Sequence, residues 1–347
     1  MSSQDINSFT EFPYQIEVFA TNLLIPWAIA ISKEGKIYIT ERIGRVWVIE
    51  DHRFLPQPLI TLEAPFISQG EGGLLGIALD PDFIDNRFIY VMHSYYENGA
   101  FYNRVVRLLE SKDKATIHGV IIDQIPGGRI HNGGRIKIGP DQKLYITTGD
   151  AGNAGFAQDI QSLAGKILRL ELDGRIPVDN PFHNSAVYSL GHRNPQGLAW
   201  NTDQVLYASE HGQTANDEIN IILPGANYGW PLVQGSDENL ENKTVKPLLH
   251  SNTRTWAPSG ISFIHHGLWK DRLLAACLRG EQLISITLKN RGFEVENLEM
   301  WLVHSFGRLR EVIEADDGSI YLTTSNRDGR GNPDPKDDKI IHLIPKG

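Results

Sequence analysis

Residues 133–147, GGRIKIGPDQKLYIT, carry the pattern from which we predict the fold, because the chain repeats it. The stretch has a small or polar start, a short apolar strand, a turn built on Asp, Gly or Asn, and a second apolar strand. The same pattern occurs at residues 27–40, 75–91, 197–208, 260–276 and 311–323. A period of roughly 50–60 residues made only of strands is typical of blades stacked around an axis.

Each copy is followed by a third predicted strand, at residues 45–49, 104–108, 166–170, 219–222, 283–287 and 339–343. Several of these strands alternate apolar and polar side chains, and no segment has the period of a long helix. We therefore predict an all-β chain, a six-bladed β-propeller of four-stranded antiparallel blades. Residues 15–19 would supply the outer strand of the last blade and close the ring. The predicted domains are an N-terminal extension, 1–14, and a single propeller, 15–347.

Composition restricts the possible partners of the chain. The formal net charge of −9 argues against nucleic acid, since phosphate binding needs a basic face. No apolar run approaches the ~18 residues that a membrane helix needs. The single cysteine, Cys277, excludes an intrachain disulfide and a cysteine-based zinc site, and its apolar strand predicts a buried structural thiol. The first residues lack a basic segment followed by an apolar one, so we expect either a cytoplasmic protein or a removed export signal.

A histidine and an aspartate flank the two strands of the third repeat. His131 stands before the first strand, and Asp150 follows the second. Because neighbouring antiparallel strands bring these positions to the same end, the two side chains should meet. A carboxylate behind an imidazole fixes its tautomer and raises its basicity, which predicts a general base. The alternative is a loop histidine hydrogen-bonded to a turn aspartate.

Arginines occupy matching places in other repeats. Arg193 precedes the fourth repeat, Arg308 and Arg310 precede the sixth, and Arg279 ends the second strand of the fifth. Arginines that are only solvated surface groups would be scattered. Convergence on one rim of an acidic chain instead predicts a site for a polyanion, because the guanidinium fork suits carboxylates.

A polar loop, residues 209–220, follows the fourth repeat. It combines Gly212 with Asp, Glu and Asn, whose oxygens suit a hard cation such as calcium. It lacks EF-hand spacing, so an ordinary loop between blades is an equally good interpretation.

Together these segments resemble the soluble quinoprotein glucose/sorbosone dehydrogenases, most closely the aldose sugar dehydrogenase branch. The matching stretches run from residue 15 to the C-terminus and are residues 70–76 with 80–83, 131–135 with 149–150, 191–197, 210–212 with 217–220, 227–231 and 308–310. The resemblance implies an enzyme that oxidises the C1 hydroxyl of an aldose to a lactone. Hydride would pass to pyrroloquinoline quinone (PQQ), and electrons to an external acceptor.

The resemblance also implies a role for each site residue. His131 would be the base and Asp150 would orient it, while the cofactor would be bound by Glu71, Arg193, Asn194, Thr255, Arg279, Arg308 and Arg310. A Ca²⁺ ion at the quinone would take the backbone carbonyls of Gly212 and Gln213. A second, structural Ca²⁺ would take Glu218 and the carbonyl of Tyr228. We expect a monomer.

The chain departs from the family pattern at four positions. Glu71 replaces a usual glutamine, Arg279 a lysine, and Gln213 a proline, while Thr253 stands where some members stack an aromatic ring. These changes lower cofactor affinity in principle. Two other functions therefore stay open: a cofactor-free propeller that binds a ligand or a protein, and a calcium-dependent lactonase. The lactonase is disfavoured because it needs acidic or amide side chains on the axis, where this chain has arginines.

Overall fold

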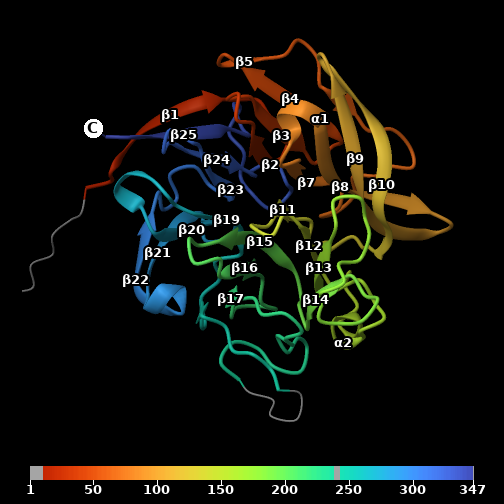
Figure 1. Cartoon of the computed structure of the whole chain (residues 1–347). Helices are drawn as coiled ribbons and strands as arrows, with labels where there is room; N and C mark the ends of the chain where they lie inside the picture. The colour runs from red at the N-terminus through yellow and green to blue at the C-terminus, as the bar shows by residue number, and fades with distance from the viewer. Residues whose placement is uncertain (1–10, 238–242, 347) are drawn as a thin grey trace, which may run out of the picture.

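The computed structural model describes residues 11–237 and 243–346, which form six antiparallel sheets arranged in a ring (Figure 1). The first blade contains β2 (Pro26–Ile31), β3 (Ile37–Glu41), β4 (Arg45–Glu50), β5 (Arg53–Phe54) and β6 (Ile60–Thr61). The second contains β7 (Leu74–Leu79), β8 (Phe88–Glu97), β9 (Ala100–Ser111) and β10 (Lys114–Pro126). The third contains β11 (Ile136–Ile138), β12 (Leu144–Thr148), β13 (Lys166–Leu170) and β14 (Val187–Leu190).

The remaining blades follow the same order from the axis outward. The fourth contains β15 (Pro195–Trp200), β16 (Leu206–Glu210), β17 (Glu218–Ile221) and β18 (Leu249–His250). The fifth contains β19 (Pro258–Phe263), β20 (Arg272–Cys277), β21 (Gln282–Lys289) and β22 (Glu294–Trp301). The sixth contains β23 (Leu309–Glu314), β24 (Ile320–Thr324), β25 (Ile340–Pro345) and, on its outside, β1 (Tyr14–Ala20).

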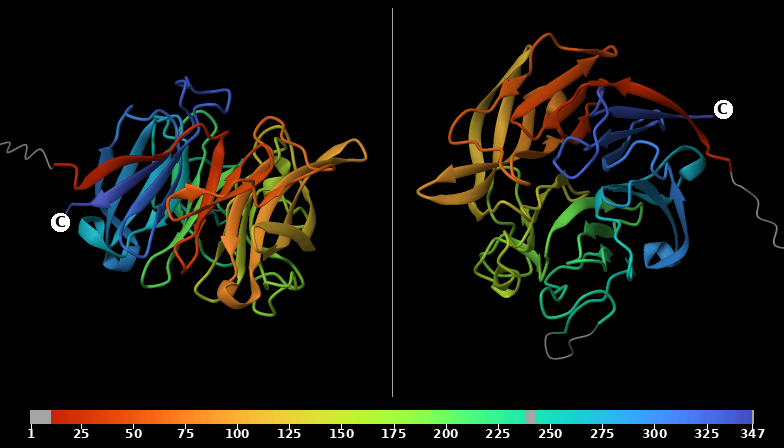
Figure 2. Two further views of the ribbon diagram at one scale, coloured as in Figure 1. Left: turned by 90° about the horizontal axis from the view of Figure 1, so that it is seen from above. Right: turned by 180° about the vertical axis from the view of Figure 1, so that it is seen from behind.

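The six-bladed propeller is therefore confirmed, as is its closure by the N-terminal strand. β1 pairs antiparallel with β25, from Tyr14 opposite Pro345 to Val18 opposite Ile341. Figure 2 shows β1 beside the C-terminal strand β25 in this blade. Most of the predicted extension, residues 1–14, lies outside the described residues, so that boundary stays a prediction.

Helices contribute little to the described residues. α1 (Phe83–Asn86) and α2 (Gly155–Gln158) have four residues each, and the two 3-10 segments are η1 (Gly267–Trp269) and η2 (Asn290–Gly292). Among the described residues, no helix is long and apolar enough to cross a membrane.

The core lies between neighbouring blades, because each sheet is covered on both faces. Tyr90 in the second blade, for example, packs in one cluster with Ile136 and Ile146 of the third. All three side chains are fully buried, and burial of such a group stabilises a fold by about 1.5–3 kcal/mol. Cys277 is buried in β20, as predicted.

Glycines let the inner strands approach closely around the axis. The N–H of Gly76 in β7 donates to the carbonyl of Gly134, just before β11, at 2.9 Å. A Cβ on Gly76 would lie 2.4 Å from that same oxygen. No side chain fits there. Because residue 76 is a glycine, β7 can approach the segment before β11, and the loops of the second and third blades come together at one mouth of the channel.

Candidate functional site

His131 and Asp150 meet at this mouth. Nδ1 of His131 lies 2.7 Å from Oδ1 of Asp150. The carboxylate also accepts hydrogen bonds from the backbone N–H of Gly152 and the indole N–H of Trp230, both at 2.8 Å. Burial alone would raise the pKa of Asp150, but hydrogen bonding to His131, with help from Gly152 and Trp230, outweighs it and lowers that pKa.

This arrangement determines how the imidazole is protonated. An ionised carboxylate accepts only, so Nδ1 carries the proton and Nε2 presents its lone pair. No hydrogen bond from residues 11–237 or 243–346 reaches Nε2. His131 lines a cavity of about 290 Å³, so its ring can accept a proton from a molecule bound there.

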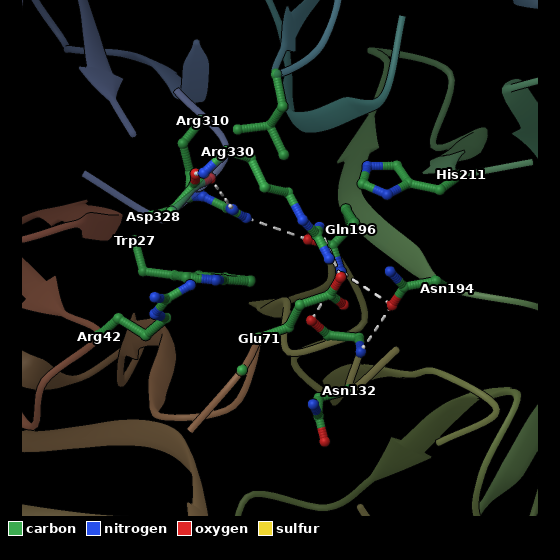
Figure 3. Close-up of a pocket in the computed structure, with 14 residues that line it drawn as sticks. Trp27, Arg42, Glu71, Asn132, Asn194, Gln196, His211, Arg310, Asp328 and Arg330 are labelled. Carbon is green, nitrogen blue, oxygen red and sulfur yellow. Dashed lines mark hydrogen bonds and ion pairs between the residues drawn. The ribbon is translucent and has the colours of Figure 1, made fainter. Parts of the chain in front are cut away.

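Two adjoining cavities make up the site. The outer one is lined by the residues of the histidine loop together with Arg193, Arg279, Arg308, Thr255, Gly212 and Gln213. The inner one, about 190 Å³, reaches Trp27, Arg42, Gln196, Arg310 and Asp328. Glu71, Asn194, His211, Leu278 and Arg330 line both and so mark the boundary between them. Figure 3 shows the inner cavity, with Arg330 and Glu71 facing each other.

The predicted arginines gather around these cavities, but they are not equivalent. Arg193 lies 5.4 Å from the centre of the Trp230 ring, and its Nε is buried without a hydrogen-bond partner among the described residues. Burial lowers the pKa of Arg193, against the opposite effect of Asp150. Arg279 is exposed at the rim.

The two arginines of the sixth blade are buried rather than exposed at the mouth. Arg308 makes two hydrogen bonds to Oδ2 of Asp328, at 3.1 and 2.9 Å. Arg310 contacts Gln196 Oε1 at 3.3 Å and stacks over Trp27 at 5.5 Å. Burial lowers the pKa of Arg310 to about 9, although Asp328 opposes the shift. Asp328 therefore already pairs with Arg308, while an added anion near Arg310 would favour the charged form of that buried guanidinium.

Asn194 and Thr255 are held in place by the loops around them. The amide oxygen of Asn194 accepts the N–H of Gly133 at 3.0 Å and a hydrogen bond from Gln196 at 3.1 Å. Its amide nitrogen is left to face the cavities. Thr255 donates its hydroxyl to the carbonyl of Thr214 at 2.9 Å, so its oxygen remains an acceptor.

The predicted metal residues fall in two places. Gly212 and Gln213 line the outer cavity, in a turn so tight that a Cβ on Gly212 would lie 1.9 Å from the carbonyl oxygen of Ala215. Glu218 and Tyr228 line a separate small cavity together with Glu210. The described residues contain no cluster of three or more His, Cys, Asp or Glu suited to a metal. A cation at the first place would depend on backbone carbonyl oxygens, and one at the second could also use the carboxyl groups of Glu210 and Glu218.

Two carboxyl groups, those of Glu210 and Glu218, line the second place. Burial, together with the carboxylate of Glu210, raises the pKa of Glu218 to about 8. One oxygen of Glu218 accepts the N–H of Gly235 at 3.0 Å. The ring of Tyr228 stacks on His192, with ring centres 4.7 Å apart. With its raised pKa, Glu218 is largely protonated at neutral pH in the metal-free protein, and a cation that binds to its carboxylate would have to displace that proton.

Sequence reasoning missed several residues of the site. Trp27 and Arg42 belong to the first blade, and Asp328 and Arg330 to the loop between β24 and β25. Trp230 lies in the matching stretch 227–231, but its contact with Asp150 is not predictable from that stretch. The β24–β25 loop lies outside the repeated pattern, and its one signal is a run of charged residues with glycines at 327–331.

The chain is similar in sequence to known sugar dehydrogenases. The family model for glucose/sorbosone dehydrogenases matches residues 23–334. The chain is 30% identical to the aldose sugar dehydrogenase YliI of Escherichia coli K12, across 90% of this chain and 91% of that protein. It is 32% identical to quinoprotein glucose dehydrogenase B of Acinetobacter calcoaceticus, across 70% of this chain and 59% of that protein.

A solved structure is similar over nearly the whole chain. The PQQ-bound form of an aldose sugar dehydrogenase from Streptomyces coelicolor superposes with a TM-score of 0.87 and 37% identity. The match covers 96% of this chain and 98% of that one.

Proposed function

The chain belongs to the glucose/sorbosone dehydrogenase family, a family of oxidoreductases, and we propose that it is a PQQ-dependent aldose sugar dehydrogenase. In the proposed reaction, an aldose loses the proton of its C1 hydroxyl and a hydride from C1, which leaves the lactone. Two electrons pass from the reduced site to an external acceptor. The observation that carries the proposal is the His131–Asp150 pair beside an arginine-lined cavity.

The residues present fit a polyanionic cofactor. PQQ bears three carboxylates, and the outer cavity has four arginines, Arg193, Arg279, Arg308 and Arg330, against two carboxylates, Glu71 and Asp217. Nε of Arg193, Nε of Arg42 and Nε2 of His211 are buried without a hydrogen-bond partner in the described part of the chain. Unpaired buried groups of this kind are costly unless a ligand satisfies them. When bound, the cofactor supplies an ortho-quinone that accepts the hydride.

The protein's own contribution is proton transfer and orientation. Nε2 of His131 accepts the proton of the C1 hydroxyl, while Asp150 holds Nδ1–H and stabilises the imidazolium that forms. Trp230 and Gly152 keep the Asp150 carboxylate fixed, so the ring does not need to reorient during the reaction. General-base catalysis of this kind contributes about 10²–10⁴-fold to a rate.

Calcium would serve two purposes. At the carbonyls of Gly212 and Gln213 it would neutralise part of the cofactor's charge and act as a Lewis acid. At Glu218 and Tyr228 it would connect the start of β17 with the segment that follows this strand. The turn at Gly212 is closed by a hydrogen bond from its N–H to Oδ1 of Asp217 at 3.0 Å. This contact supports a rigid calcium site at Gly212 and Gln213.

One experiment tests the function directly. Purified protein is loaded with PQQ and CaCl₂, an aldose panel and a redox dye are added, and the absorbance of cofactor and dye is followed. We expect cofactor reduction by the aldose and dye reduction with turnover. Cofactor binding without turnover on any aldose would favour a binding protein, and lactone hydrolysis without PQQ would favour a lactonase.

A further inference from the structure

The backbone of His131 adopts a conformation that a histidine does not prefer. Its φ is +55°, in the left-handed region, which is energetically unfavourable for a residue with a Cβ. Its carbonyl accepts the N–H of Ala151 at 3.0 Å. Its N–H donates to Oε2 of Glu71 at 2.8 Å. A carboxylate from another blade therefore holds the strained backbone of the proposed base.

Glu71 is itself held by contacts to both its backbone and its carboxylate. Its N–H donates to the carbonyl of Arg129 at 2.8 Å, two residues before His131. The preceding Gly70 permits this approach, since a Cβ there would lie 2.1 Å from the same oxygen. Burial opposes ionisation, but the N–H of His131 and the guanidinium of Arg330 outweigh it and lower the pKa of Glu71. Its carboxylate is therefore ionised at neutral pH.

The second oxygen of Glu71 points to the opposite side of the site. Oε1 lies 2.7 Å from Nη1 of Arg330, which comes from the β24–β25 loop of the sixth blade. The N–H of Arg330 donates to Oδ1 of Asp328 at 2.9 Å, and Asp328 in turn holds Arg308. Glu71 and Arg330 each line the inner and the outer cavity. Figure 3 shows their side chains facing each other in the inner one.

From this geometry we propose that Glu71 is a positioning residue. Its carboxylate sets the backbone, and through it the imidazole, of His131, and Arg330 holds that carboxylate from across the site. The inference rests on the proposed function for its catalytic consequence. It differs from the sequence-based assignment of Glu71 to the cofactor: the negative charge is neutralised by Arg330 and serves the base, rather than opposing an anionic ligand.

Two variants of Glu71 separate these roles. Glu71→Gln keeps an oxygen that can accept the N–H of His131 but loses the charge that binds Arg330. Glu71→Ala removes both contacts. Arg330→Ala removes the outer support alone, and the Glu71→Gln/Arg330→Ala double variant completes a cycle. If Arg330 acts through Glu71, the double variant should lose no more turnover than the worse single one.

The structural readout needs neither cofactor nor sugar. In ¹⁵N-histidine-labelled apo-protein, the His131 amide, assigned by its absence in His131→Asn, should exchange with solvent at least about tenfold faster in Glu71→Ala. Glu71→Gln should keep most of the protection, and Arg330→Ala should fall between. The amide of His265 is a matched control in the same spectra, because it donates to Glu314 Oε2 at 2.8 Å in another part of the ring.

The kinetic readout then tests the consequence. Glu71→Ala should lower kcat by about 10- to 100-fold while the Kd for PQQ changes less than about threefold, with Glu71→Gln recovering most of kcat. Unchanged His131 exchange in Glu71→Ala, or a variant that loses PQQ affinity with kcat intact, would overturn the proposal. If wild-type protein oxidises no aldose, the proposed function fails, while the exchange experiment still decides whether Glu71 positions His131.

Discussion

The guanidinium of Arg135 donates a hydrogen bond to the carboxylate of Glu311 at the centre of the propeller. Arg135 precedes β11 in the third blade and Glu311 lies in β23 of the sixth, on the opposite side of the ring. Arg135 also stacks on Trp27 of the first blade at 4.4 Å and donates to the carbonyl of Gln196 in the fourth at 2.9 Å. One buried pair thus connects four blades beneath the site.

Removal of one partner from this pair should be costly. Glu311→Gln leaves the Arg135 charge buried without its counter-ion, which typically lowers the free energy of unfolding by about 3–5 kcal/mol. Arg135→Met combined with Glu311→Gln removes that charge, so the double variant should be more stable than Glu311→Gln alone. Chemical denaturation of the wild type, Glu311→Gln, Arg135→Met and the double variant measures these losses. A double variant that loses the sum of the single losses would contradict the pairing.

Arg308 and Arg310 should both contribute to cofactor affinity. Replacement of either by Ala should weaken PQQ binding by about 1.5–3 kcal/mol, the usual worth of a hydrogen bond to a charged group. Arg308→Ala should also lose thermal stability, because Asp328 is left without its closest counter-ion. Titration of PQQ with calcium present gives the affinities. Arg291→Ala is the control, since that exposed guanidinium pairs with Asp203 on the outside of the ring. Unchanged PQQ affinity in both Arg308→Ala and Arg310→Ala would contradict the proposed polyanion site.

The two proposed calcium sites should separate experimentally. A chelator should abolish PQQ binding, because the metal neutralises part of the cofactor's charge. Calcium should also raise the Tm of the apo-protein, and Glu218→Gln should lose most of that rise, since Glu218 and Glu210 form the anionic part of the second site. The same variant should keep calcium-dependent PQQ binding at Gly212 and Gln213. Tight PQQ binding in the presence of a chelator would count against the first site.

Stability should depend on pH through a buried histidine outside the site. Burial lowers the pKa of His93 to about 4, and its ring contacts the carbonyl of Ser94 and the Nε–H of Arg104. The unfolded chain, with a histidine pKa near 6.5, binds a proton more readily, so this contribution is intact above about pH 6.5 and is lost toward pH 4, by about 1.4 kcal/mol per unit. His93→Asn should show a flatter profile in denaturation experiments between these pH values. If the free energy of unfolding of His93→Asn falls with decreasing pH as steeply as that of the wild type, other groups cause the pH dependence.

The strands were predictable because the propeller repeats one local pattern. Apolar runs such as 144–148 and 206–210 are buried on both faces, and their turns contain Asp, Gly or Asn. The outer strands were not individually predictable: β5, β6 and β18 have two residues each and pair only where a neighbouring strand offers an edge. Their existence depends on tertiary contacts that no local period records.

The site was predictable where it coincides with the repeat and not elsewhere. His131 precedes the first strand of a predicted hairpin and Asp150 follows the second, so antiparallel pairing brings both to the same end. Arg330 belongs to a long loop with no repeated counterpart, and its contact with Glu71 depends on how the sixth blade closes onto the first. The same holds for Asp328, whose pairing leaves Arg308 buried rather than exposed.

The proposed role of His131 as the base makes the most direct prediction. His131→Ala should keep PQQ affinity yet lose about 10²–10⁴-fold in kcat, because alanine has no group that could accept the C1 proton. Asp150→Asn should lose less, since the imidazole remains but its tautomer and orientation are less well fixed. Steady-state kinetics with an aldose give kcat for each variant, and a PQQ titration gives the affinity.

A structural histidine would give a different pattern. His131→Ala would then show a lower Tm, while turnover per folded, cofactor-loaded molecule stayed near normal. The left-handed φ of His131 sharpens the comparison, because His131→Asn tolerates that backbone conformation better than Ala and keeps a polar side chain. If His131 is the base, His131→Asn should recover stability without recovering kcat. Near-normal turnover in either variant would exclude the proton transfer assigned to this residue.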